Sequence, residues 1–198
     1  MKMNSIQKRT AVFGSEFKTR AEEDKKVIEG YFVVYNQATE LWQGVLEEIS
    51  DKALLKSLTT NDVRCLFNHD TNIVLGRTGN ETLKLKSDDY GLYGTLEINE
   101  KDTQALDIYH RIARGDINAC SFGFYPTRES RHEEEDGVIR YVVEEGDIHE
   151  VSPVTFPAYP TTEIAASKKD FELDQRKEQA KRDFKIRKQK LKEKYINE

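Results

Sequence analysis

A serine in a short apolar frame is the residue of this chain best suited to chemistry. Ser121 lies within residues 119–124 (ACSFGF), whereas 34% of the chain is charged, so its apolar surroundings stand out. Far from it in sequence, His69 is bracketed by Asn68 and Asp70, a setting that fits either a base held in one tautomer or a turn histidine with capping neighbours. A hydroxyl, an imidazole and a carboxylate are the groups that acyl transfer requires. The first two are therefore a candidate nucleophile and a candidate general base.

Two adjacent residues compete for the third position, the group that would orient the base. His149 and Glu150 are neighbours in residues 148–154 (IHEVSPV). In an extended chain their side chains point to opposite faces, so only one of them reaches a shared site. A carboxylate orients an imidazole and stabilises its cation, and a second histidine does so more weakly. The sequence leaves the choice between Glu150 and His149 open.

Other reactive groups have simpler interpretations. Cys120 is an alternative nucleophile, but a small apolar residue in a strand is more often part of a core. A metal site built on His69 and Asp70 is disfavoured, because adjacent residues rarely point at one ion and no third ligand is suitably spaced. His110 lies in a charged helical pattern and His132 in an acidic run, so we expect both to face water. The sequence therefore predicts no metal and no organic cofactor.

The surrounding pattern predicts a mainly β fold with peripheral helices (α+β). We expect strands at residues 27–35, 63–67, 73–77, 82–86, 92–98, 117–125, 139–143 and 148–156. Helical spacing predicts one helix over residues 50–58 that Ser50 caps, and another over residues 102–114 that Gly115 ends. Residues 128–137 are predicted to be a charged loop. Many short strands with few helices favour a closed or nearly closed barrel.

Charge and cysteine content exclude several classes of protein. The net charge is −5, but residues 168–198 hold twelve Lys/Arg and seven Asp/Glu, a net of +5, which leaves −10 on the preceding residues. An acidic body repels phosphate, so we expect no nucleic-acid partner. No apolar run approaches the length of a membrane span or of a secretory signal. Two cysteines form no disulfide framework, which is typical of a soluble protein of a reducing compartment.

The composition changes near residue 167, which divides the chain into a predicted domain at 1–166 and a tail at 167–198. The tail lacks Gly and Pro, and its apolar residues form a sparse stripe: Leu173, Ala180, Phe184, Leu191 and Tyr195. This pattern is typical of a long solvated helix, a coiled-coil partner, or a segment that orders on binding. Because the tail is basic, we expect it to bind an acidic partner or the acidic surface of the preceding domain.

Several separate stretches together resemble one known family. They are residues 28–31 (IEGY), 66–70 (LFNHD), 74–78 (VLGRT), 114–117 (RGDI), 121–124 (SFGF) and 150–160 (EVSPVTFPAYP), in this order. The chain resembles the prohead proteases of tailed bacteriophages, the capsid maturation proteases of the HK97 type. The resemblance runs from about Arg9 to Ala166, nearly the whole chain before the tail.

The resemblance implies a serine endopeptidase with a β-barrel fold related to that of the herpesvirus assembly proteases. Ser121 matches the family's nucleophile, His69 its base and Glu150 its acidic third member; the herpesvirus enzymes use a second histidine there, and His149 is adjacent. The implied substrates are scaffold protein, a scaffold-like segment of the major capsid protein, and the protease itself. The implied location is the assembling prohead in the host cytoplasm, without cofactor or membrane, and with a homodimer as the expected assembly. A different class remains as the alternative, a non-catalytic scaffold that uses the same barrel for assembly.

Overall fold

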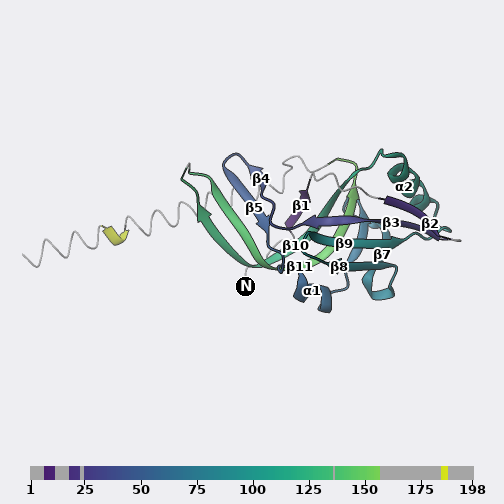
Figure 1. The fold of residues 1–198 in the computed structure, drawn as a ribbon, viewed down its shortest axis with the longest axis horizontal. Helices are drawn as coiled ribbons and strands as arrows, with labels where there is room; N and C mark the ends of the chain where they lie inside the picture. Colours follow the sequence, from purple (N-terminus) through teal and green to yellow (C-terminus); the bar gives the residue numbers. More distant parts are fainter. Residues whose placement is uncertain (1–6, 12–17, 23–24, 136, 157–183, 187–198) are drawn as a thin grey trace, which may run out of the picture. The chain divides into compact units, whose positions relative to one another are not determined.

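The computed structural model describes residues 7–11, 18–22, 25–135, 137–156 and 184–186 (Figure 1). The chain divides into two units, Met1–Tyr159 and Pro160–Glu198. In the second unit the described residues 184–186 form part of a helix with exposed side chains. The remainder of the tail predicted at 167–198 lies outside the described residues, and so does the end of the motif at 150–160.

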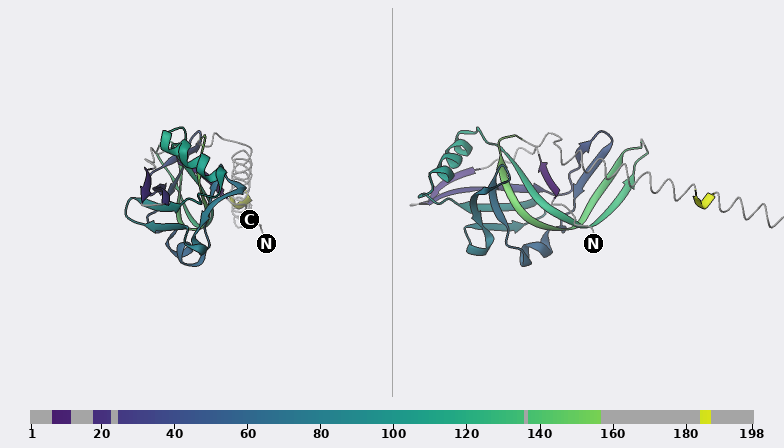
Figure 2. Two further views of the ribbon diagram at one scale, coloured as in Figure 1. Left: turned by 90° about the vertical axis from the view of Figure 1, so that its right-hand side faces the viewer. Right: turned by 180° about the vertical axis from the view of Figure 1, so that it is seen from behind.

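The strands of the first unit form two sheets (Figures 1 and 2). Five strands of the seven-stranded sheet follow the order β1 (Gln7–Ala11), β10 (Ala119–Glu133), β11 (Ile139–Val154), β5 (Val45–Ile49), β4 (Thr39–Trp42). The other two form a branch, in which β11 also pairs with β6 (Arg64–Phe67) and β6 pairs with β7 (Asp70–Arg77). The four-stranded sheet has the order β2 (Lys18–Glu22), β3 (Lys25–Val34), β9 (Gly91–Glu97), β8 (Leu83–Ser87). The mainly β prediction is confirmed, but the barrel is not closed. Among the described strands, no ladder joins one sheet to the other.

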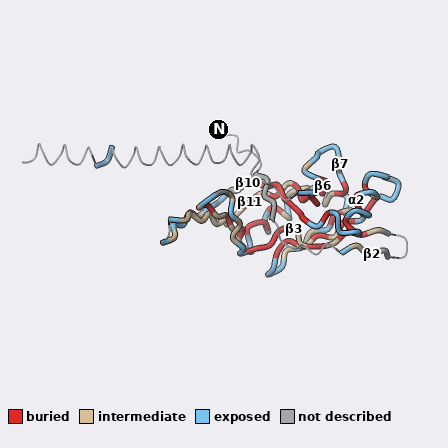
Figure 3. The backbone as a smooth tube through the Cα atoms, turned by 90° about the horizontal axis from the view of Figure 1, so that it is seen from above, coloured by how far each residue is buried: buried red, intermediate tan, exposed pale blue. Residues whose placement is uncertain are grey.

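Both sheets and helix α2 (Thr103–Arg114) contribute to one hydrophobic core. Buried backbone follows β3, the first part of β10 and the second part of β11 (Figure 3). The helix begins where the Asp102 carboxylate accepts hydrogen bonds from the amides of Gln104 and Ala105, and it ends at Gly115 with a φ of 87°. The stop at Gly115 is the one that the sequence predicts, and the Asp102 side chain supplies the N-cap. Within the described ranges, no helix is long and apolar enough to cross a bilayer.

Helix α1 (Leu55–Thr60) begins later than predicted. Residues 51–54 form turns, and the residue that precedes the helix is Leu54, which makes no side-chain cap. Ser50 therefore does not cap this helix; its carbonyl accepts the Ala53 amide within the turn. A short 3-10 helix, η1 (Thr78–Asn80), connects β7 to β8.

The predicted charged loop at residues 128–137 is wrong, because β10 continues through most of it to Glu133. The two strands predicted at 139–143 and 148–156 are one continuous strand, β11. Cross-strand ion pairs accompany this charged part: Arg128 contacts Glu144 and Glu145, and Arg140 contacts Glu48. Opposite charges on neighbouring strands support a ladder that lacks an apolar signal. Strands β4 and β5, which extend the same sheet, were not predicted either.

Candidate active site

The β10–β11 ladder carries four small or polar residues on one face. Ser121 pairs with Ser152 and Gly123 pairs with Glu150 in the antiparallel register, so the side chains of these pairs point the same way. Their neighbours Cys120, Phe122 and Val151 point the other way and belong to the hydrophobic core. Alternation along the two strands thus separates a polar face from the core.

The turn between β6 and β7 carries the candidate base. Both central residues of this turn have a positive φ, 51° at Asn68 and 60° at His69. Two consecutive positive φ values are the pattern of a type I′ hairpin turn, and asparagine and histidine are both enriched at positive φ among residues other than glycine. Contacts made by Asn68 hold this turn in place.

Those contacts attach the turn to the end of β11. The Asn68 amide donates to the Pro153 carbonyl at 3.1 Å. The Asn68 side chain accepts from the Thr155 amide at 2.8 Å and donates to the Thr155 hydroxyl at 3.1 Å. Strand β6 also pairs in parallel with β11, with Arg64 opposite Glu150. The strand that carries the candidate acid thus holds the turn that carries the candidate base.

His69 and Glu150 are in direct contact. The distance from His69 Nδ1 to Glu150 Oε1 is 2.5 Å. The second carboxylate oxygen, Oε2, accepts the Ser152 hydroxyl at 2.5 Å. The His69 side chain is 17% exposed, and Glu150 is 7% exposed as a residue. Both oxygens of a nearly buried carboxylate therefore have described partners.

This contact determines how the imidazole can act. An ionised carboxylate only accepts hydrogen bonds, so the ring donates from Nδ1 and leaves Nε2 as its acceptor. An imidazole in that tautomer, held by a carboxylate, can take a proton from a hydroxyl. Ser121, on the same polar face as Glu150, is fully buried at 0% exposure.

His149 lies elsewhere. Its ring packs edge-on against Tyr125, with 4.9 Å between ring centroids. The expected alternation with Glu150 does not hold here, because the β10–β11 register shifts between Gly123 and Phe124 and leaves His149 as the extra residue of a β-bulge. Of the two candidates for the third position, Glu150 is the one in contact with His69.

Both cysteines lie in the core, away from the polar face. Cys120 is 1% exposed, and its thiol contacts the backbone carbonyls of Tyr31 and Phe32. Burial, with a smaller contribution from the charge of Glu150, raises the pKa of the Cys65 thiol well above its usual range. Neither environment favours a reactive thiolate. His110 and His132 are exposed, as predicted, although His132 lies in β10 rather than in a loop.

Sequence reasoning missed two residues of the polar face. A Cβ atom on Gly123 would lie 2.6 Å from Glu150 Oε1, so glycine leaves the space that the carboxylate occupies. The sequence indicated only that Gly123 permits a close approach. Ser152 was not considered, although it lies two residues from Glu150, and alternation in an extended strand places such residues on one face. That spacing was the available signal.

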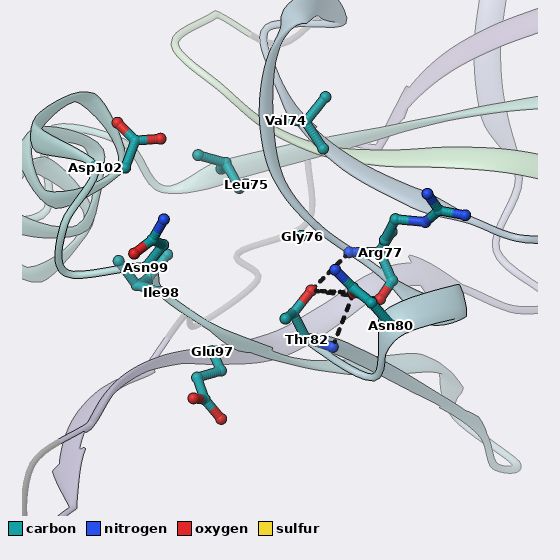
Figure 4. A pocket seen from close by; sticks show the side chains of 10 residues that line it. All are labelled: Val74, Leu75, Gly76, Arg77, Asn80, Thr82, Glu97, Ile98, Asn99 and Asp102. Carbon is teal, nitrogen blue, oxygen red and sulfur yellow. Dashed lines mark hydrogen bonds between the residues drawn. The ribbon is translucent and has the colours of Figure 1, made fainter.

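A pocket of about 410 Å³ lies beside β7, away from these groups (Figure 4). It is lined by Val74, Leu75, Gly76, Arg77, Asn80, Thr82, Glu97, Ile98, Asn99 and Asp102. Its polar groups serve the local fold: Asp102 caps α2, Thr82 bonds to Asn80, and Arg77 bonds to Asp62. Among the described residues, no three His, Cys, Asp or Glu side chains are grouped to hold a metal ion.

A serine, a histidine and a glutamate positioned on one sheet have the residue types of a serine-hydrolase site. The profile of the caudovirus prohead serine protease family matches residues 15–177. The chain therefore belongs to the caudovirus prohead serine proteases.

The fold is similar to that of the solved structure of the bacteriophage T4 capsid assembly protease, gp21. The TM-score is 0.50 and the sequence identity is 13%; the match covers 75% of this chain and 96% of the T4 chain. At this identity the likeness concerns the fold alone. No curated protein matches the sequence.

Proposed function

We propose that this protein is a serine endopeptidase that cleaves capsid scaffold, or a scaffold-like segment of the major capsid protein, during prohead maturation. The observation that carries the proposal is the His69–Glu150 contact at 2.5 Å on the sheet face that also carries Ser121. The family supports the activity class. The motifs of the sequence support the finer relation, to proteases of the HK97 type and to the herpesvirus assembly proteases.

In the proposed mechanism Ser121 Oγ attacks the scissile carbonyl carbon while its proton passes to His69 Nε2. Glu150, through its contact with Nδ1, stabilises the imidazolium that forms. The imidazolium then gives the proton to the leaving amine as the C–N bond breaks, which leaves an acyl-enzyme on Ser121. Water attacks the ester carbonyl with His69 again as base, and the imidazolium returns the proton to Ser121 Oγ as the acyl C–O bond breaks, so the second product leaves as a carboxylic acid. No step uses a metal or a cofactor.

The test is co-expression with the capsid subunit and scaffold of the same phage, with mass spectrometry of the products. Ser121→Ala should lower cleavage by at least about 10⁴-fold without loss of fold, which circular dichroism checks. Ser130→Ala, on the same strand but bonded to the exposed His132, is the matched control and should cleave normally. A folded Ser121→Ala protein that cleaves as well as wild type would rule out serine catalysis. An inactive wild-type protein that still promotes assembly would support the non-catalytic scaffold instead.

The proposed location is the assembling prohead in the host cytoplasm, with self-cleavage and a homodimer as further parts of the proposal. The basic tail from residue 168 onward supports a docking role, since its charge is opposite to that of the preceding residues. Deletion from Lys168 should lower incorporation into proheads and leave hydrolysis of a peptide in solution unchanged. Normal packaging of the truncated protein would end the docking proposal.

A further inference from the structure

Ser152 has a buried hydroxyl with a defined role in the geometry of the site. The residue is 0% exposed, and its Oγ donates to Glu150 Oε2 at 2.5 Å. The other oxygen of the same carboxylate contacts His69. Hydrogen bonds to a charged acceptor are short and stronger than neutral ones, so this contact is well suited to fixing an orientation.

Glu150 needs such a restraint because the residue paired with it on the opposite strand has no side chain to pack against its carboxylate. Its partner in the register, Gly123, has no side chain, and the carboxylate lies in the space that a Cβ would fill. Glutamate has several rotatable bonds, so an unrestrained carboxylate samples other rotamers. A hydroxyl from the same strand face removes that freedom without blocking the approach of His69.

Ser152 is also directly opposite Ser121 in the β10–β11 register. A serine hydroxyl has a single donor, and the Ser152 donor points to Glu150. Toward Ser121, the Ser152 hydroxyl can therefore only accept a hydrogen bond. Its own proton points to Glu150 and is not placed to pass to His69. Its position favours a supporting role over a role as a second nucleophile.

We propose that Ser152 is a positioning residue, which holds Glu150 in the rotamer that contacts His69. This inference rests on the proposed function for its kinetic consequence, whereas its geometric consequence is independent of activity. The residue acts through Glu150 and does not touch the substrate.

The kinetic test compares Ser152→Ala with Ser57→Ala. Ser57 is a matched control, since it is also a buried serine whose hydroxyl contacts β11, by accepting the Ile148 amide, but it does not contact the catalytic groups. Ser152→Ala should lower kcat by about 10- to 100-fold with KM nearly unchanged, because a slightly misplaced base slows the chemical step. Ser57→Ala should lower the unfolding temperature and leave kcat of the folded protein unchanged. Equal kcat values for Ser152→Ala and wild type would overturn the proposal.

The geometric test is proton NMR in a Ser121→Ala background, which prevents self-cleavage. A short His–carboxylate hydrogen bond gives a strongly downfield Nδ1 proton, which His69→Gln should remove and His149→Gln should leave in place. Adding Ser152→Ala should broaden or shift this signal, and adding Ser57→Ala should not. An unchanged signal in the Ser152→Ala protein would contradict the inference even if the protein proves not to be a protease. Absence of wild-type cleavage with the expected change in the signal would instead reject the proposed function alone.

Discussion

The two faces of the β10–β11 ladder are built from the same short stretches of sequence but serve different ends. On one face, Cys120, Phe122 and Val151 are packed into the hydrophobic core. On the other, Glu150 and Ser152 form a hydrogen-bonded chain that reaches His69. Burying each large apolar side chain contributes about 1.5–3 kcal/mol to folding. The hydrogen bonds of the polar face instead fix the positions of Glu150 and His69.

The comparison teaches that a rigid core on one face can position reactive groups on the other. Where the register is regular, as from Ser121 to Gly123, residues one position apart cannot exchange faces unless the register slips, and a slip would expose the whole apolar set. Packing of the core face therefore fixes the order of groups on the polar face. The charges and hydroxyls there need only local hydrogen bonds to complete the site.

The largest effect in this comparison is expected from the charge on the polar face. Glu150→Gln should lower kcat/KM for peptide hydrolysis by about 10³- to 10⁴-fold, because the amide no longer stabilises the imidazolium. His149→Gln, one residue away and packed on Tyr125, is the matched control and should retain full activity. The reverse result, with His149→Gln the inactive variant, would assign the third position to His149.

A smaller effect is expected from filling the space on the polar face. Gly123→Ala places a Cβ about where Glu150 Oε1 lies, at 2.6 Å, so the carboxylate must move away from His69. We expect kcat to fall about 100-fold with a modest loss of stability. Gly146→Ala is the control, since its Cβ would contact the Phe124 ring at 3.0 Å instead. Equal kcat in Gly123→Ala and Gly146→Ala would show that the space beside Glu150 is not required.

The turn that carries His69 should show a still smaller effect. Asn68→Ala loses the hydrogen bonds to Thr155 and places a less tolerant residue at a φ of 51°. We expect a loss of about 1–2 kcal/mol in the free energy of unfolding and about a tenfold loss of kcat. Asn68→Gly keeps the backbone freedom but not the bonds, so denaturant unfolding of both variants separates the two contributions. Wild-type stability in both would show that the Asn68 side chain does not hold this turn on β11.

The core face should show no chemistry at all. Iodoacetamide should leave Cys65 and Cys120 of the native protein unmodified at pH 8, because both are buried and the raised pKa of Cys65 keeps its thiol protonated at that pH. Both should react after unfolding, as mass spectrometry of the alkylated peptides would report. Rapid alkylation of Cys120 in the native protein, with loss of activity, would indicate Cys120 on the core face as the nucleophile in place of Ser121.

Strong local signals made much of the fold predictable. Helical spacing and the stop at Gly115 defined α2, and the apolar runs defined β3 and β9. The charged arm of β10 and β11 was missed, because its ladder is supported by ion pairs between distant residues such as Arg140 and Glu48. The open arrangement of two sheets depends on which strands pair, and strand periodicity alone does not specify pairing.

The same distinction applies to the site. The residue types of Ser121, His69 and Glu150 indicated the chemistry, but alternation does not separate His149 from Glu150, because a bulge at His149 interrupts the β10–β11 register. The sequence did not determine which of the two contacts His69, because that contact depends on the parallel pairing of β6 with β11. For Ser152 the sequence offers only its spacing of two residues from Glu150, and the contact of its hydroxyl with the carboxylate comes from the structure.

The most direct measurement is the site of covalent labelling by a small dialkyl fluorophosphonate, which forms a phosphoester with an activated serine and releases fluoride. Tryptic digestion yields a peptide over residues 115–128 in which Ser121 is the only serine. The expected result is one adduct on Ser121 that is absent in Ser121→Ala and at least about 100-fold slower to form in His69→Ala. An adduct on another residue, or labelling of Ser121 that does not depend on His69, would contradict a catalytic site on this face.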